Sequence, residues 1–261
     1  MDCELRGKLA MISGAGQGIG LAIAELFAQE GADISVCSRN GALLHEVAAR
    51  IERDYDVQCL SVAADLTTPD GIASWMTATM SRFGRIDILI NNASATKGGS
   101  FLDLTPDIWH QALALKLHGY IQVARAILPV MQSQNSGSIV NIVGVTGSQP
   151  VPNGMIGAVA GAALINFTKA LAIEVAQWGI RVNAVSPGST ETYRRTAMLE
   201  GLRRSGMSES EAEKASVREI PLGRAARTKE IANVAVFIAS DLASYVTGEN
   251  VNVDGGYVRG I

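Results

Sequence analysis

The segment Leu9–Gly20, with the sequence LAMISGAGQGIG, decides the fold of this chain. Its first five residues predict a buried strand, and a helix is expected to begin at Gly18. The glycines between them let the backbone turn sharply and approach a pyrophosphate, which the amides and dipole of a helix N-terminus stabilise. The spacing differs from the common G-x-G-x-x-G pattern, and a plain tight turn is the alternative interpretation. The position after the first strand of a βαβ unit favours nucleotide binding.

Short apolar runs alternate with helical patterns along nearly the whole chain. The expected strands are Leu9–Ser13, Asp33–Cys37, Gln58–Ala63, Ile86–Asn91, Ser138–Val143, Arg181–Ser186 and Asn250–Val253. The expected helices are Gly18–Gln29, Gly41–Arg53, Pro69–Phe83, Pro106–Met131, Ile156–Ala176 and Lys229–Ala239. Strands that are apolar on both faces are typical of a parallel sheet covered by helices. The pattern therefore predicts an α/β fold, a Rossmann-type doubly wound parallel sheet of about seven strands flanked by helices.

Residues 1–261 contain no linker or compositional break, which predicts a single domain. Residues 190–219 are an exception in composition, because they are polar and charged. We expect this segment to form one or two short helices outside the sheet. It is either a solvated surface insertion or a substrate lid.

The composition sets further bounds on function. Hydrophobic residues make up 48% of the chain and charged residues 18%, which is enough for a large core. A net charge of −3 gives no electrostatic reason to expect nucleic acid or an anionic membrane as a partner. The longest apolar run, residues 155–165, is far shorter than the roughly 20 residues that span a bilayer. We expect a soluble, cytoplasmic protein, and no metal site, since no His, Cys or carboxylate cluster has ligand spacing.

The second expected strand ends without an acidic residue that would accept ribose hydroxyls. Ser38 and Arg39 stand there instead. A guanidinium forms bidentate hydrogen bonds with phosphate, which favours NADP(H) over NAD(H). The alternative is an ordinary exposed arginine.

Taken together, these motifs resemble the short-chain dehydrogenase/reductase family over about residues 5–257. Gly14, Gly18 and Gly20 match its G-x-x-x-G-x-G motif. Further matches are Asp65-Leu66, Asn91-Asn92-Ala93-Ser94 with Ser94 as a departure, Asn183–Gly188 followed by Thr190 and Thr192, Tyr245–Gly248, and Val253–Gly256. The resemblance implies a homotetramer or homodimer acting on a small-molecule substrate. It also implies a dinucleotide site formed by Gly14, Gln17, Gly18, Ile19, Gly20, Ser38, Arg39, Asp65, Leu66, Asn91, Ala93, Pro187, Gly188, Thr190 and Thr192.

The residues that perform catalysis in that family are missing from the matching positions. The family keeps a Tyr, a Lys four residues later, a Ser thirteen residues before the Tyr, and an Asn on the preceding helix. Anchored on the flanking segments 139–142 and 162–164, the Ser, Tyr and Lys positions fall on Gly144, Gly157 and Gly161, and the Asn position on Lys116. No Tyr lies between residues 120 and 193, so a shift of register does not restore the set.

Gly157 and Gly161 are four residues apart and face one side of a helix. With Gly144 they predict an enlarged pocket, and the alternative is tight helix packing. Lys116 is a candidate base or amine nucleophile, since burial lowers a lysine pKa, and Tyr120 on the same helical face is its candidate partner. The alternative for Lys116 is a structural cation or a side chain that extends to solvent.

Tyr193 is a candidate substitute acid or an aromatic side chain over the pocket, and an exposed loop tyrosine is the more ordinary interpretation. His118 is expected to point away from Lys116. Three functional hypotheses follow. The first is an NADP(H)-binding enzyme with non-standard chemistry, including non-redox chemistry, on a small organic substrate. The second is an NADP-dependent oxidoreductase that acts on a carbonyl or alcohol with a substitute proton donor, and the third is a non-catalytic cofactor-binding subunit or sensor.

Overall fold

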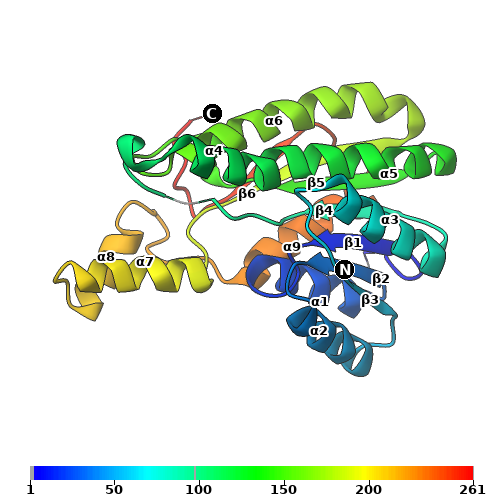
Figure 1. The fold of residues 1–261 in the computed structure, drawn as a ribbon, viewed down its shortest axis with the longest axis horizontal. Coiled ribbons are helices and arrows are strands. Elements are labelled where there is room, and N and C mark those ends of the chain that lie inside the picture. The colour runs from blue at the N-terminus through cyan, green and yellow to red at the C-terminus, as the bar shows by residue number, and fades with distance from the viewer. Residues whose placement is uncertain (1–2, 97, 261) are drawn as a thin grey trace.

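The protein is built on one seven-stranded parallel sheet in the order β3-β2-β1-β4-β5-β6-β7 (Figure 1). The computed structural model describes residues 3–96 and 98–260. The strands are β1 (Leu9–Ser13), β2 (Asp33–Ser38), β3 (Cys59–Ala63), β4 (Ile88–Asn91), β5 (Gly137–Ile142), β6 (Ile180–Pro187) and β7 (Asn250–Val253). The predicted single-domain doubly wound α/β fold is confirmed. The strand order reverses direction between β1 and β4, which is where such sheets bind ligands at their carboxyl ends.

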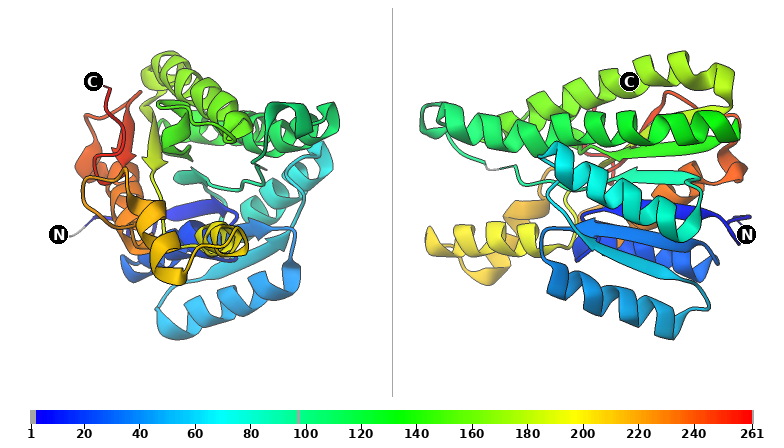
Figure 2. Two further views of the ribbon diagram at one scale, coloured as in Figure 1. Left: turned by 90° about the vertical axis from the view of Figure 1, so that its left-hand side faces the viewer. Right: turned by 45° about the vertical axis from the view of Figure 1, so that its right-hand side comes forward.

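Helices cover both faces of the sheet (Figure 2). Each face has its own apolar core. One face carries α1 (Gly18–Gln29), α2 (Gly41–Asp54) and α9 (Thr228–Ala239), and the other α3 (Pro69–Phe83), α5 (Tyr120–Gln134) and α6 (Met155–Val175). Short 3₁₀ turns are η1 (Phe101–Asp103), η3 (Val145–Gly147), η4 (Ala176–Trp178) and η5 (Asp241–Ala243).

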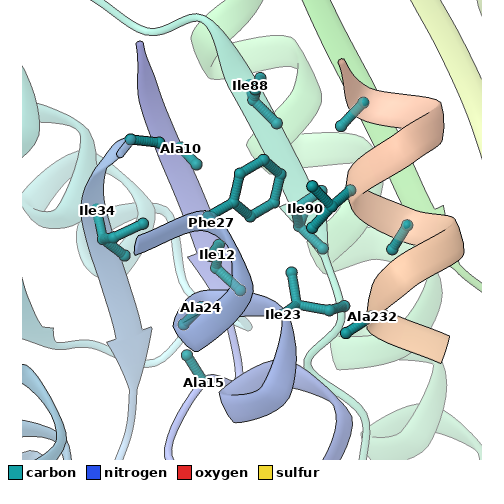
Figure 3. Packing of buried hydrophobic residues seen from close by; sticks show 14 of the residues in the cluster. Ala10, Ile12, Ala15, Ile23, Ala24, Phe27, Ile34, Ile88, Ile90 and Ala232 are labelled. Carbon is teal, nitrogen blue, oxygen red and sulfur yellow. The ribbon is translucent and has the colours of Figure 1, made fainter. Parts of the chain in front are cut away.

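Helix α1 holds the glycine-rich loop in place because its apolar stripe is fully buried against the central strands. Figure 3 shows the ring of Phe27 between strand residues, with Ile23 and Ala24 on the same side of the helix. All three side chains have no exposed surface. Burial of side chains such as Phe27 and Ile23 stabilises the fold by about 1.5–3 kcal/mol each. The start of α1 is thereby fixed at the sheet edge.

The prediction of one regular helix over Pro106–Met131 is wrong in detail. The segment forms α4 (Pro106–Leu113), a π-helical turn η2 (Ala114–Gly119), and α5, which continues to Gln134. A π turn adds one residue to a helical turn and often marks a functional position. Here it contains Lys116, whose side chain is buried rather than extended to solvent.

Two helices leave the sheet between β6 and α9. They are α7 (Tyr193–Arg204) and α8 (Glu209–Val217), which project from the body of the molecule in Figure 1. Helix α7 has no buried residue, so its position does not depend on an apolar core of its own. A capping box at Ser208 and Glu211 begins α8.

Helix α6 is longer than the apolar run seen in the sequence. The segment Met155–Trp178 is long and apolar enough to cross a bilayer by length and composition alone. In the fold, α6 packs against β6 and η3 and contributes Leu171, Ala172 and Val175 to the core. Packing accounts for part of its apolar composition, since 39% of the most apolar window is buried.

Candidate active site

A cleft of about 1170 Å³ runs along the carboxyl edge of the sheet. Its walls come from the segments that follow β1 to β6, together with residues of α7 and α8. The cleft therefore lies where the strand order predicts a ligand site, between the glycine-rich loop and the α7–α8 segment.

The glycine-rich loop forms the part of the cleft suited to phosphate. Gly14 and Gly18 have φ angles of +68° and +62°, which side-chain-bearing residues rarely adopt. A Cβ on Gly14 would lie 2.9 Å from Ala93 Cα, so only glycine allows the loop after β1 to pack against the segment after β4. Gln17, the residue before α1, makes no side-chain cap, so the first amides of α1 have no side-chain acceptor. This cradle fits a pyrophosphate.

The neighbouring part of the cleft suits the adenosine half of a dinucleotide. Ser38, Arg39, Asp65 and Leu66 line it. Hydrogen bonds from the Thr67 amide and hydroxyl, at 2.9 and 2.8 Å, hold the pKa of Asp65 below its usual value. Arg39 adds a weaker lowering effect on the pKa of Asp65, and it forms no ion pair within the described residues. Its guanidinium is free to bind an anion.

Most of the residues expected to bind the dinucleotide do line the cleft. Beyond those already named, they are Gln17, Ile19, Ala93, Pro187, Gly188, Thr190 and Thr192. Gly20 and Asn91 are not among its lining residues. A Cβ on Gly20 would collide with the carbonyl of Gly14, so this glycine permits packing behind the loop. Asn91 is 1% exposed, and its amide donates to Asn141 Oδ1 at 3.1 Å, so it braces β4 against β5.

Lys116 also lines the cleft and is 4% exposed. Its Nζ donates to the carbonyl oxygen of Ile142 at 2.6 Å and to the Tyr120 hydroxyl at 3.2 Å. No carboxylate in the described residues forms an ion pair with it. Burial, and to a smaller extent the charge of Arg194, lowers the pKa of Lys116 to about 7. At neutral pH the amine therefore exists in both protonation states.

Tyr120 supports this amine and is 2% exposed. Its hydroxyl lies 3.2 Å from the Ile142 carbonyl, and Lys116 Nζ lies 4.9 Å from the centre of its ring. Burial raises the pKa of Tyr120 above its ordinary value, so the phenol stays protonated at neutral pH. The predicted pairing of Lys116 with Tyr120 is present, with Tyr120 as a hydrogen-bond partner.

Two of the three glycines singled out in the sequence face the cleft. Gly144 has a φ of +112° and open space around its Cα, and a Cβ on Gly157 would make an ordinary contact, 3.5 Å from Thr146 Oγ1. Gly161 does not line the cleft. A Cβ there would lie 2.8 Å from Gly147 Cα, so η3 packs directly on α6 at this point. The predicted enlarged pocket is wrong for Gly161, where tight packing is the correct interpretation.

Tyr193 lies on the rim of the cleft and is 55% exposed. The next residue, Arg194, donates from Nη2 to the Ser94 carbonyl at 2.8 Å and so links α7 to the segment after β4. His118 is exposed, on the side of the helix away from the cleft. Sequence reasoning missed Arg194, although a cation in the first turn of a helix is an unfavourable placement that could have drawn attention to it.

Residues 14–258 match the family model described as "Enoyl-(Acyl carrier protein) reductase". The chain is 37% identical to oxidoreductase UcpA of Escherichia coli K12 over 97% of its own length and 95% of the relative's. It is 36% identical to 3-oxoacyl-[acyl-carrier-protein] reductase FabG of Thermotoga maritima, over 98% and 99% of the two chains.

Among solved structures, L-sorbose reductase from Gluconobacter frateurii, complexed with NADPH and L-sorbose, superposes with a TM-score of 0.96. That similarity covers 100% of both chains at 34% sequence identity. The agreement extends over the sheet, both helical layers and the α7–α8 segment. The glycine cradle, the sheet order and these full-length similarities together place the chain in the short-chain dehydrogenase/reductase family.

Proposed function

We propose that the protein is an NADP(H)-dependent oxidoreductase that interconverts a carbonyl and an alcohol on a small organic substrate. Of the three hypotheses from the sequence, the one with a substitute proton donor has the best support. The observation that carries it is Lys116, a buried amine on the cleft with a pKa of about 7. A general acid–base group works best when its pKa is near the working pH.

The cleft offers a place for each part of the cofactor. The loop from Gly14 to Gly18 suits the pyrophosphate, and Arg39 suits a ribose 2′-phosphate, which is the basis for proposing NADP(H) over NAD(H). When bound, NADPH supplies a hydride.

Reduction of a carbonyl also consumes a proton at the oxygen. The Lys116 ammonium donates that proton and is left as a neutral amine, which the Tyr120 hydroxyl and the Ile142 carbonyl hold in place until it is reprotonated from solvent. In the reverse direction the neutral amine accepts the alcohol proton. Gly144 and Gly157 carry no side chain at the positions where the family resemblance implies Ser and Tyr, so Lys116 has no competing donor there.

Replacing Lys116 by methionine tests this assignment. The assay follows NADPH oxidation with a panel of ketoses, oxo acids and 3-oxoacyl thioesters, and NADPH binding is measured separately by fluorescence. Loss of the proton donor should lower kcat/KM by about 10²- to 10⁴-fold while NADPH still binds. Lys169→Met is the matched control, because Lys169 is exposed, pairs with Glu249 at 3.0 Å and lies off the cleft. Turnover unchanged in Lys116→Met, or a wild-type protein that binds no dinucleotide, would refute the proposal.

The pH dependence has a defined sign. Reduction needs the protonated amine, so its rate should fall as pH rises through about 7, and alcohol oxidation should fall as pH drops through the same value. Lys116→Met should lack this inflection in both directions. An identical inflection in the variant would assign it to another group.

We also propose a homo-oligomer. Apolar side chains are exposed on α6, where Ile173 is 74% exposed, and near β7, where Tyr245 is fully exposed. Faces of this kind are typical of subunit contacts. Light scattering after size exclusion should give a mass of two or four chains, and a monomer at micromolar concentration would contradict this proposal.

A further inference from the structure

Positively charged side chains outnumber negatively charged ones along the cleft, although the chain as a whole has a net charge of −3. Apart from Arg39 and Asp65, the charged residues that line it are Lys116, Arg194, Arg195, Arg218 and Glu219. Arg195 is neutralised by Glu213, whose carboxylate lies 2.6 Å from its guanidinium. If the negative charge of Glu219 is taken to balance the positive charge of Arg218, Lys116 and Arg194 still have no carboxylate partner among the residues described. A cleft with two unneutralised cations favours an anionic ligand.

Arg194 and Lys116 act on the same region of the cleft. Arg194 Nη2 donates to the Ser94 carbonyl at 2.8 Å. This bond holds the guanidinium, which extends from α7, against the segment that follows β4. Its charge is close enough to contribute to the lowered pKa of Lys116. Two cations that repel each other at one site are each stabilised by an anion that lies against both.

The beginning of α7 adds to this preference. A helix N-terminus favours negative charge, yet the first turn of α7 contains no acidic residue and carries Arg194 and Arg195. The Thr192 side chain does not cap the helix either. The Nε atom of Arg195, whose side chain is 11% exposed, is buried without a hydrogen-bond partner among the described residues. The first turn of α7 thus carries positive charge without an acidic residue or a side-chain cap.

We assign the cofactor phosphates to the Gly14–Gly18 loop, which adjoins Thr192 before α7, and to Arg39. We propose that Arg194 binds an anionic oxygen group of the substrate, a carboxylate or a phosphate, and so directs the substrate carbonyl toward Lys116. This inference rests on the proposed function, because it assigns a substrate class to the same cleft. Arg194 Nε donates to the Tyr193 hydroxyl at 3.4 Å and Nη2 to the Ser94 carbonyl, so Nη1 and the second N–H of Nη2 are left to bind the anionic group and orient it.

The test measures binding by calorimetry to protein saturated with NADP⁺, so that no turnover is needed. Two matched pairs of probes are used: acetoacetate against methyl acetoacetate, and dihydroxyacetone phosphate against dihydroxyacetone. We expect one anion to bind at least about 10-fold more tightly than its neutral counterpart, and the pair that shows this identifies carboxylate or phosphate as the group bound. Arg194→Met should remove about 10- to 100-fold of that affinity and leave the neutral probes unchanged.

Arg203→Met is the matched control, since Arg203 lies on the same helix, off the cleft. Arg194 is exposed, so its replacement should not affect folding, which thermal unfolding verifies. Equal binding of anionic and neutral probes, or an Arg194→Met protein that keeps the preference for the anion, overturns the inference. Failure to bind NADP⁺ contradicts the proposed function instead, and the same probes are then titrated into the cofactor-free protein to decide the inference alone.

Discussion

Lys116→Met should change how the stability of the protein depends on pH, whatever the substrate is. An ordinary lysine has a pKa of 10.5, and that of Lys116 in the folded protein is lowered to about 7, mainly by burial. Between these values the unfolded chain binds a proton at this residue and the folded chain does not. Stability therefore rises with pH across this window, and it is reduced as pH falls toward 7.

The size of the effect follows from the two pKa values. One pKa unit corresponds to about 1.4 kcal/mol, and titration is incomplete near each end of the window. Integrating from pH 7 to pH 9 gives a gain of about 2 kcal/mol in the free energy of unfolding of the wild type that comes from Lys116. Tyr120, which lies beside it, keeps its proton in this range because burial raises its pKa. Methionine binds no proton, so the variant lacks this component.

Urea denaturation at pH 7, 8 and 9 measures the effect. The difference in unfolding free energy between wild type and Lys116→Met should shift by about 2 kcal/mol between the end points, in favour of the wild type at pH 9. Lys169→Met, which removes an exposed lysine, should follow the wild type. If wild type and Lys116→Met show parallel pH dependence, the buried amine has an ordinary pKa and the reasoning from burial fails.

Three further predictions concern packing, cofactor choice and the second half of the sheet. Gly161→Ala should lower the free energy of unfolding, measured by urea denaturation, by about 1–3 kcal/mol, because its Cβ would meet the Gly147 backbone at 2.8 Å. Gly157→Ala should leave the free energy of unfolding unchanged or raise it by up to about 1 kcal/mol. Equal effects at the two sites would contradict tight packing at Gly161. Arg39→Ala should weaken NADPH binding by about 10- to 100-fold in a fluorescence titration and leave NADH binding nearly unchanged. An equal loss of affinity for both dinucleotides would show that Arg39 does not bind the 2′-phosphate. Arg181 donates to the carbonyls of Ile238, Ala239, Ser240 and Val246 at 2.7 to 3.3 Å, so Arg181→Met should leave acceptors unpaired at the end of α9 and cost about 2–4 kcal/mol. An unfolding free energy within 0.5 kcal/mol of the wild type, as expected for a surface site, would show that water replaces these bonds.

Local chemistry made the sheet and the cofactor side of the cleft predictable. The strand at Leu9–Ser13, the loop after it and the start of α1 at Gly18 are set by residues next to one another in the chain. The same holds for the cap Thr105 and for Pro106, where α4 begins as expected. Strand β4 begins at Ile88 rather than Ile86, although the Asp87 amide donates to the Leu9 carbonyl at 3.1 Å.

The details that decide the chemistry depend on contacts between distant segments. A π turn in place of regular helix at Ala114–Gly119 leaves the apolar periodicity almost unchanged, so the sequence pattern does not reveal it. Whether a glycine faces a cavity or a neighbouring backbone depends on what lies opposite, and only the fold places Gly147 against Gly161 and leaves Gly157 at the cleft.

The sequence alone predicted the family resemblance, the parallel sheet, the phosphate cradle and the unusual lysine at position 116. Each of these features depends on short-range patterning and residue type. The tertiary structure alone decided that this lysine is buried with no carboxylate paired to it among the described residues, that the Ile142 carbonyl and Tyr120 hold it, and that Arg194 lines the same cleft. The physical reason is that a pKa and an electrostatic field depend on the surroundings of a charge in space, and these come from β5, the π turn and α7, which lie far apart in the chain.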